Sequence, residues 1–272
     1  MVDLRSLVKD LGGHLETQAQ ASLDAQGADV LRVRLDSRQV QAGDLFVALE
    51  GSSQNGSRYA LDALARGACA ILSQAPLEPA WQREQTVPVW IHPRARAIAG
   101  HVAAQLLGHP SRGMFVVAVT GTNGKTTTAH LISQLMAACG KRSGVLGTSG
   151  NRLADGQLRP ATHTTPDAPS LQEWVALHRS LGGDALALEA SSHALDQERL
   201  AGLDVDVLPM IPRAVMEGGH VRVGLEDAPF GSDKSNLQWV EEAAQRIGNV
   251  GGELATARDV RAALAPEDQE MP

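Results

Sequence analysis

The sequence predicts an α/β fold, because short apolar runs of strand character alternate along the chain with longer amphipathic stretches. One of these apolar runs leads directly into a glycine-rich loop, and a helical stretch follows the loop at once. The 272 residues suffice for about two domains, each with a core of its own. Together these observations favour mostly parallel sheets with helices on their faces.

In the first part of the chain, strand-like and helical segments alternate up to a break near residue 110. Expected strands are 33–35, 45–48, 70–72 and 87–91, and expected helices are 59–66 and 94–107. The stretch G-H-P-S-R-G at 108–113 interrupts helix and strand alike, so it predicts a domain boundary.

The second part repeats the alternation around the glycine-rich loop. Strands are expected at 114–119, 143–146 and 185–188, and helices at 128–138 and 171–181. Further along, 218–227 predicts a strand that opens into a loop, and helices are expected at 234–247 and 256–264. This last stretch has the pattern of one βα unit.

The composition excludes several classes of function. With 24 Lys and Arg against 31 Asp and Glu, the net charge of -7 gives no basic surface for nucleic acid or an anionic membrane. Aromatic residues, at 3%, are too few for base-stacking platforms. No apolar run approaches the length of a membrane span, and no secretory signal segment is found at the N-terminus. Cys69 and Cys139 lie far apart in apolar stretches, typical of buried thiols in a reducing compartment. We therefore expect a cytoplasmic protein with no nucleic-acid or membrane partner, of open oligomeric state.

The glycine-rich loop T-G-T-N-G-K-T-T at 120–127 has the chemistry of a phosphate site. Its glycines allow backbone N–H groups to turn toward an anion, and the following helix offers its positive end. Lys125 can reach terminal phosphates, and the Thr126 hydroxyl can hold Mg²⁺. The pattern is the short G-x-x-G-K-T form, because Val119 stands where the longer form has its first glycine. The predicted nucleotide-binding residues are Gly121, Thr122, Asn123, Gly124, Lys125, Thr126 and Thr127.

This loop resembles that of the Mur ligases, ATP-dependent amide-forming enzymes of peptidoglycan precursor synthesis. Three further strings follow the family order: L-D-S-R with G-D-L-F-V-A near residues 35–48, H-T-T-P-D at 163–167, and E-A-S-S-H-A-L-D-Q-E-R at 189–199. They narrow the resemblance to the branch that adds the third residue to UDP-N-acetylmuramoyl-L-alanyl-D-glutamate. The resemblance covers about residues 25–206 and implies ATP and Mg²⁺ as cofactors, with a UDP-N-acetylmuramoyl peptide and an amino acid as substrates.

The resemblance also implies substrate-binding residues, taken position by position. Leu35 and Ser37 would contact the uridine diphosphate moiety. A second nucleotide-sugar contact would fall on Ser52, Ser53 and Gln54, where the residue types differ from the family's. The muramoyl peptide would be held by His163, Thr164, Thr165, Ser191, Gln197 and Arg199.

Glu189 ends the strand expected at 185–188, at the edge where open α/β sheets bind ligands. A hard carboxylate oxygen there suits a Mg²⁺ ion that bridges phosphates. Thr126 and Glu189 are therefore the candidate Mg²⁺ ligands, and Lys125 and Glu189 the candidate catalytic residues. The resemblance implies that a substrate carboxylate attacks the γ-phosphate of ATP, after which an amine displaces phosphate from the acyl phosphate. A solvated strand-end acid is the alternative for Glu189 taken alone; four motifs in family order favour the ligand.

After residue 206 the resemblance ends, and neither the family's lysine for a second Mg²⁺ nor its C-terminal amino-acid domain is recognised. We therefore expect a truncated ligase that is deficient in ligation. Residues 207–265 instead resemble the end of the β-keto acid cleavage enzymes, zinc-dependent barrels in which Glu226 would be a zinc ligand. Their H-x-H ligand pair is absent from this sequence. The alternatives are a non-catalytic module that binds ATP or a UDP-sugar, and a zinc-dependent keto acid cleavage enzyme.

The expected domains follow from these resemblances. They are an N-terminal uridine-nucleotide domain at 1–110, an incomplete P-loop ATP-binding domain at 111–206, and a βα tail at 207–272.

Overall fold

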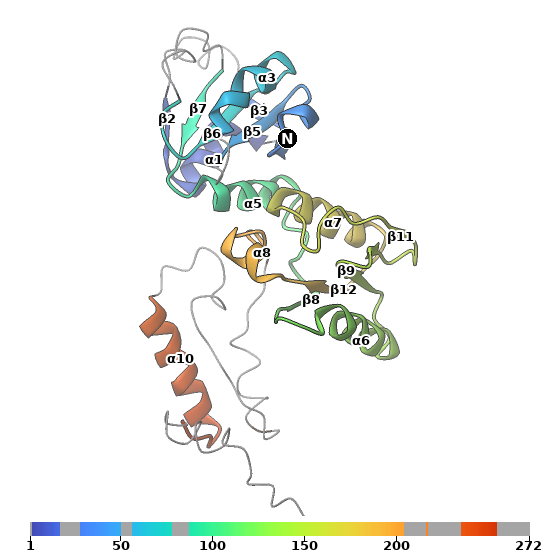
Figure 1. Ribbon diagram of the computed structural model, residues 1–272. Helices are drawn as coiled ribbons and strands as arrows, with labels where there is room; N and C mark the ends of the chain where they lie inside the picture. The colour runs from blue at the N-terminus through green and yellow to red at the C-terminus, as the bar shows by residue number, and fades with distance from the viewer. Residues whose placement is uncertain are drawn as a thin grey trace, which may run out of the picture. The chain divides into compact units, whose positions relative to one another are not determined.

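The computed structural model describes residues 2–16, 28–49, 56–77, 87–203, 216 and 235–254. The chain divides after residue 204 into two compact units. The described part of the first unit contains a two-stranded sheet and two five-stranded sheets with their helices (Figure 1). In the second unit the structure describes helix α10 (Asn236–Asn249).

The first five-stranded sheet has the order β2-β7-β6-β5-β4. Its strands are β2 (His14–Glu16), β4 (Arg32–Arg34), β5 (Asp44–Ala48), β6 (Ala70–Ser73) and β7 (Val89–Ile91), all parallel except β2, which is antiparallel to β7. All five residues of strand β5 are buried, and the four after Asp44 are apolar, as expected for a strand with both faces covered. Leu45 and Val47 belong to one apolar cluster and Phe46 and Ala48 to another.

Helices supply the other side of each cluster. Helices α1 (Leu4–Leu11) and α5 (Ala95–Leu106) contribute to the cluster with Leu45, and α3 (Ala60–Ala65) to the cluster with Phe46. Short elements complete this region: β1 (Val2–Asp3) antiparallel to β3 (Asp29–Val30), and the 3₁₀ turns η1 (Ser37–Gln39) and η2 (Gly56–Tyr59). The strands before residue 31 were not expected, since they are too short to show a two-residue period, and helix α1 was missed as well.

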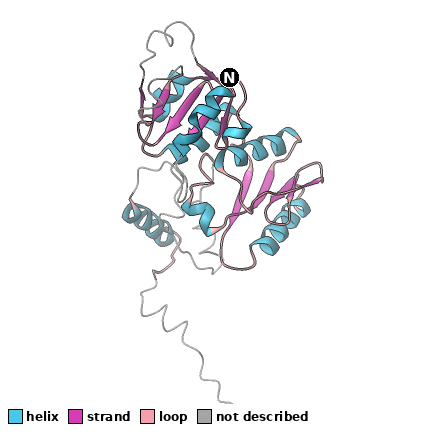
Figure 2. Ribbon diagram, turned by 45° about the horizontal axis from the view of Figure 1, so that its top comes forward, coloured by secondary structure: helices cyan, strands magenta, loops and turns pink. Residues whose placement is uncertain are grey.

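The second five-stranded sheet has the order β11-β10-β9-β12-β8. Strands β8 (Phe115–Val119), β9 (Ser143–Leu146) and β12 (Ala185–Glu189) are parallel, while β10 (Asn151–Arg152) and β11 (Leu158–Arg159) form an antiparallel extension. Helices α6 (Lys125–Ala138) and α7 (Ala168–Ser180) lie on opposite faces of this sheet, and a short helix α8 (Ser192–Asp196) follows β12 (Figures 1 and 2).

The α/β fold class and the mostly parallel second sheet are thus confirmed. Both helices of this sheet begin three residues earlier than predicted. Helix α6 starts at Lys125 because Gly124, at φ +79°, turns the chain directly into it. Helix α7 starts at Ala168 because the Asp167 carboxylate accepts a hydrogen bond from the Ser170 amide at 3.0 Å.

Some elements were missed, one begins later than predicted, and two predictions cannot be compared with the structure. The hairpin β10–β11 and helix α8 were not predicted, since neither is long enough to show a period. Helix α10 begins two residues after the predicted start, behind a capping box formed by Ser235 and Gln238. The strand expected near 218 and the helix expected at 256–264 lie outside the described residues.

The two cysteines differ in their surroundings. Cys69 is half-buried, and burial raises the pKa of its thiol to about 11. Cys139 is exposed at the end of α6, so the expectation of two buried thiols is wrong for this residue. Among the described residues, no helix combines the length and the apolar character that a membrane span requires.

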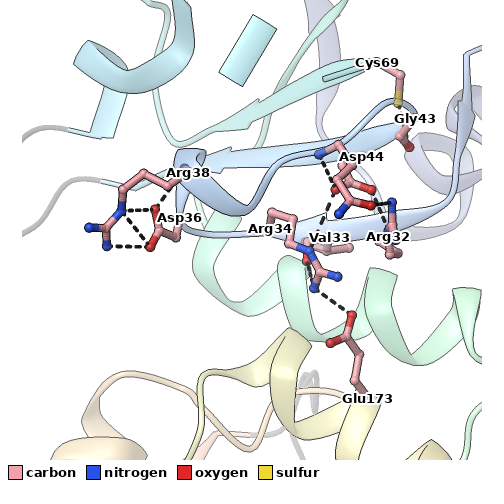
Figure 3. A network of polar contacts seen from close by, with 10 residues as sticks. Arg32, Val33, Arg34, Asp36, Arg38, Gly43, Asp44, Cys69 and Glu173 are labelled. Carbon is pink, nitrogen blue, oxygen red and sulfur yellow. Dashed lines mark hydrogen bonds and ion pairs between the residues drawn. The ribbon is translucent and has the colours of Figure 1, made fainter. Parts of the chain in front are cut away.

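Polar contacts connect the two larger sheets of the first unit. Helix α5, beside the first sheet, packs against α7, beside the second (Figure 1). The Arg34 guanidinium on β4 donates to the Glu173 carboxylate on α7 at 2.7 Å (Figure 3). On the same strand, Arg32 donates at 2.8 Å to the fully buried carboxylate of Asp44. These ion pairs fix β4 against both its neighbouring strand and α7.

His178 is a fully buried histidine that ties three segments together. Its Nδ1 accepts a hydrogen bond from the Ala154 amide at 3.1 Å, which leaves Nε2 to donate to the Ala185 carbonyl at 2.9 Å. The imidazole is therefore held in the neutral form. Burial is the main cause that lowers the pKa of His178, and it outweighs the opposing effect of the Ala185 carbonyl and Asp184.

We predict that His178 makes the fold sensitive to mild acid. Because its pKa is lower in the folded state, the unfolded chain binds the extra proton, and stability is lost as the pH falls below about 6.5. Urea unfolding of the wild type and of H178Q between pH 7.5 and 5 measures this effect. The wild type should lose up to about 1.4 kcal/mol more per pH unit than H178Q, which keeps a donor and an acceptor but does not titrate. Equal slopes for the two proteins would contradict the assignment.

Candidate nucleotide and substrate site

Three chain segments meet where the parallel strands of the second sheet end. Val119 of β8 is paired with Glu189 of β12, and Leu188 of β12 with Leu146 of β9. The loop 120–124, the end of β12 and the segment that starts at Gly147 therefore lie at one edge of the sheet. This is the edge at which open α/β sheets bind ligands.

The loop 120–124 has the backbone of a phosphate cradle. Gly121 and Gly124 have φ values of +133° and +79°, which side chains other than glycine rarely allow. The Lys125 ammonium donates to the carbonyl of Gly121 at 2.7 Å and lies 3.4 Å from that of Thr122. The loop itself is exposed. A cation over an accessible loop at the positive end of a helix suits a polyphosphate.

Glu189 is 1% exposed, and its carboxylate accepts three hydrogen bonds. The donors are the Thr126 hydroxyl at 2.9 Å, the Thr148 amide at 2.9 Å and the Thr148 hydroxyl at 3.3 Å. Within the described ranges, no lysine, arginine or histidine forms an ion pair with it. A buried carboxylate compensated by neutral donors only is chemically suited to a cation.

Gly147 is required for this placement of Glu189. A Cβ atom at residue 147 would overlap the Glu189 carboxylate oxygen Oε1 and would lie 2.7 Å from its Cδ. Any larger residue therefore displaces the carboxylate from Thr126 and Thr148. The spacing of the two strand ends leaves room for glycine alone.

The donor set fits Mg²⁺ better than a transition metal. The part of the chain that the structure describes has no group of three or more His, Cys, Asp or Glu side chains able to hold a metal ion. One carboxylate and one hydroxyl, Glu189 and Thr126, are typical of Mg²⁺, which takes its remaining ligands from phosphates and water. Zinc ordinarily requires three protein ligands or more.

The predicted peptide-binding residues gather beside Glu189. The Thr165 hydroxyl donates to the Glu189 carbonyl at 2.8 Å and accepts from the Ser191 amide at 3.2 Å. Arg199 donates to the Thr165 carbonyl at 2.7 Å and to Gln197 Oε1 at 2.8 Å. A cavity of about 410 Å³ opens here; its lining includes Thr148, His163, Thr164, Thr165, Ser191 and Arg199. The exposed side chain of His163 contacts the Thr162 hydroxyl.

The predicted uridine-contact residues line a separate cavity of about 670 Å³ on the first sheet. Leu35 and Ser37 border it, together with Asp36, Arg38 and Asp62. Hydrogen bonds from Ser37 and then from Arg66 hold the pKa of Asp62 below its ordinary value. Asp36 is paired with Arg38 at 2.7 Å. Among the described residues, this cavity and the cavity beside Glu189 share no lining residue.

Four of the predicted site residues cannot be compared with the structure. Ser52, Ser53, Gln54 and Glu226 lie outside the described residues. Conversely, sequence reasoning missed Gly147 and Thr148. A signal was present, since Gly147 follows the expected strand 143–146 directly, as Glu189 follows 185–188.

Three family models match parts of the chain, and two of these matches overlap. Residues 29–106 match the Mur ligase family catalytic domain, and residues 119–210 the Mur ligase middle domain. Residues 167–265 match the beta-keto acid cleavage enzyme family. The last two matches share residues 167–210.

Several curated relatives carry the name UDP-N-acetylmuramoyl-L-alanyl-D-glutamate--2,6-diaminopimelate ligase. The protein of Chromobacterium violaceum is 40% identical over 184 residues, which are 68% of this chain and 37% of the relative. The protein of Alkalilimnicola ehrlichii is 43% identical over 200 residues, which are 70% of this chain and 40% of the relative. A solved structure of a ligase with this name has a TM-score of 0.59 and 32% identity, covering 75% of this chain and 39% of that one. The chain thus spans about two fifths of the length of these relatives.

We predict that G147A destabilises the first unit through its effect on Glu189. The added methyl group overlaps the buried carboxylate, and overpacking of this kind costs about 1–3 kcal/mol. Chemical unfolding of the wild type, G147A, E189A and the double variant forms a double-mutant cycle. The cost of G147A should be much smaller in the E189A background. Equal costs in both backgrounds would mean that the clash is not with Glu189.

Proposed function

From residue 29 to residue 210 the chain belongs to the Mur ligase family, and on this premise we propose that it binds Mg·ATP beside a UDP-linked peptide substrate. The proposed reaction is that of the relatives' name, the attachment of diaminopimelate to UDP-N-acetylmuramoyl-L-alanyl-D-glutamate. The observation that carries the proposal is the hydrogen bond from Thr126, the residue after Lys125, to the buried carboxylate of Glu189.

Lys125 and the loop amides would bind the ATP phosphates. The ammonium already lies within 2.7 Å of a loop carbonyl, so a small movement of a flexible side chain would bring it to a β- or γ-phosphate. The glycine loop and the start of α6 would supply uncharged donors to the same oxygens.

Thr126 and Glu189 would hold Mg²⁺, Thr126 through its hydroxyl and Glu189 through a carboxylate oxygen. The ion would neutralise charge on the transferring phosphoryl group. Burial of Glu189 keeps the carboxylate fixed and poorly hydrated, which strengthens its attraction for a cation.

The peptide carboxylate would be presented from the cavity beside Thr164, Thr165 and Arg199. In the proposed reaction, an oxygen of this carboxylate attacks the γ-phosphorus, the bond to the β-phosphate oxygen breaks, and ADP leaves. The amine of the amino acid then attacks the acyl carbon, loses a proton and displaces phosphate. The task of the protein is to position the two anions and offset their charge.

We further propose that this 272-residue chain by itself does not complete ligation. The support for this proposal is that residues 167–265 match a different family, the beta-keto acid cleavage enzymes. The ligase and a non-catalytic module that binds ATP or a UDP-sugar differ in one measurable property, phosphate release that depends on added diaminopimelate. A cytoplasmic location accords with a site for ATP and a nucleotide-linked substrate.

A zinc-dependent keto acid cleavage activity is the second candidate, because residues 167–265 match that family. The H-x-H ligand pair expected for such enzymes is absent from the sequence. Metal analysis of the purified chain decides this candidate: one equivalent of bound zinc would support it.

We predict that K125A weakens Mg·ATP binding at least about 100-fold, since the variant loses a charge-assisted contact worth about 3 kcal/mol. Calorimetric titration of the purified chain measures the affinity. K141A is the matched control, because Lys141 is an exposed lysine at the far end of α6 that lies 3.5 Å from Asp184. It should bind Mg·ATP as the wild type does. Unchanged affinity of K125A would refute the role of the loop.

A further inference from the structure

Thr148 lies between the peptide cavity and the carboxylate of Glu189. It is an exposed residue, and it lines the cavity of about 410 Å³. The Thr148 hydroxyl donates to Glu189 Oε2 at 3.3 Å and to the Thr164 hydroxyl at 3.0 Å. Thr164 is a predicted peptide-binding residue, and Glu189 is a candidate Mg²⁺ ligand. One hydroxyl group therefore contacts both parts of the proposed site, and the proposed reaction gives it no task.

The Thr148 hydroxyl has a single proton and two acceptors, so it can donate fully to only one of them at a time. The charge of the buried carboxylate favours donation to Glu189, and the shorter distance favours donation to Thr164. The carboxylate also accepts from the Thr126 hydroxyl and from the Thr148 amide, both at 2.9 Å. The position of the proton is therefore sensitive to the charge at Glu189.

A cation at Glu189 would shift this balance toward Thr164. Once the charge of the carboxylate is compensated by a metal ion, Glu189 needs the hydroxyl donor less. The Thr148 proton then turns to the nearer oxygen of Thr164. Because Thr164 accepts this proton, its own proton becomes available to a ligand in the cavity that Thr164 also lines. A carboxylate in that cavity would gain a charge-assisted hydrogen bond.

The backbone of the turn that contains Thr148 is fixed from two sides. The Gly150 amide donates to the Gly147 carbonyl at 3.0 Å and closes the turn. The Ser149 hydroxyl lies 2.8 Å from Nε2 of His130, a residue of α6. Thr148 stands between these two contacts, so its proton can change partner without a movement of the backbone.

We propose that the Thr148 hydroxyl couples the two parts of the site: with Mg²⁺ at Glu189 it turns to Thr164, and Thr164 then donates to a carboxylate of the UDP-linked peptide. This inference rests on the proposed function, because it takes both ligands from there. Thr148 is a positioning residue in this proposal, since it acts on the peptide through Thr164. Mg·ATP and the peptide should each strengthen the binding of the other, because coupling between two binding sites is reciprocal.

The test measures how the nucleotide changes the affinity for the peptide. UDP-N-acetylmuramoyl-L-alanyl-D-glutamate is titrated calorimetrically into the full chain, with and without a saturating Mg²⁺ complex of the β,γ-imido analogue of ATP. T148V and T148S are compared with the wild type. Valine keeps the shape of threonine and the backbone amide but lacks the hydroxyl, which serine retains.

The gain in peptide affinity that the nucleotide causes should be about fivefold smaller in T148V than in the wild type, and T148S should restore it to within about twofold. Without the nucleotide, T148V and the wild type should bind the peptide with affinities within about threefold of each other. A purely structural role of Thr148 would instead lower both affinities alike.

T162V is the matched control for the loss of a threonine hydroxyl from this cavity. Thr162 lines the same cavity, and its hydroxyl contacts His163 Nδ1 at 3.2 Å. The affinity of T162V for the peptide is free to change, but the gain caused by the nucleotide should equal that of the wild type.

The role of Thr148 would be overturned by a wild-type gain in T148V, by an equal loss of peptide affinity with and without the nucleotide, or by the absence of any gain in the wild type. If T148V does not fold, T164V and T164S decide in the same way, because T164V removes the acceptor hydroxyl and T164S retains it. A wild-type chain that does not bind one or both ligands would instead contradict the proposed function, and this inference with it.

Discussion

A carboxylate buried at the end of a central strand must be compensated by donors or by a cation, and Glu189 imposes this requirement on every segment around it. Thr126 on α6 and Thr148 after β9 donate to its carboxylate, and Thr165 donates to its carbonyl. Gly147 supplies the space. The segments that hold Thr126, Thr148 and Thr165 are therefore coupled at the sheet edge through one residue. A change in its charge or position would alter the hydrogen bonds of all three segments.

The sequence predicted the part of the site that follows local rules. Glycine and lysine spacing in the loop 120–125 predicts a phosphate-binding loop, and the structure has the expected strand before it and the expected helix after it. Glu189 was predictable because it ends an apolar strand. By contrast, the role of Gly147 depends on how close β9 and β12 come together in the sheet, and no local pattern records that distance.

Contacts between residues far apart in the sequence could not be predicted from local patterns. Arg34 and Glu173 are 139 positions apart, yet they form an ion pair at 2.7 Å. No local pattern singles out His178 in the sequence, and only the folded structure shows that both nitrogens of its buried ring form hydrogen bonds. The predicted site residues that lie at strand ends were placed together; those in the stretch 50–55 lie outside the described residues.

Two family models match residues 167–210, and the contacts of this segment show which part of the chain it packs with. Strand β12 lies in this overlap, and it pairs in parallel with both β8 and β9. Its terminal residue, Glu189, is bonded to Thr126 and Thr148, which precede the overlap. The contacts of β12 therefore tie it to the remainder of the Mur ligase middle domain.

The most direct test of the central claim is a crystal structure of the chain with Mg²⁺ and a non-hydrolysable ATP analogue. The account predicts triphosphate oxygens against the loop 120–125 and a Mg²⁺ ion about 2.1 Å from the Thr126 hydroxyl oxygen, on the side of Glu189. A nucleotide bound elsewhere, or a metal ion remote from both Thr126 and Glu189, would contradict it.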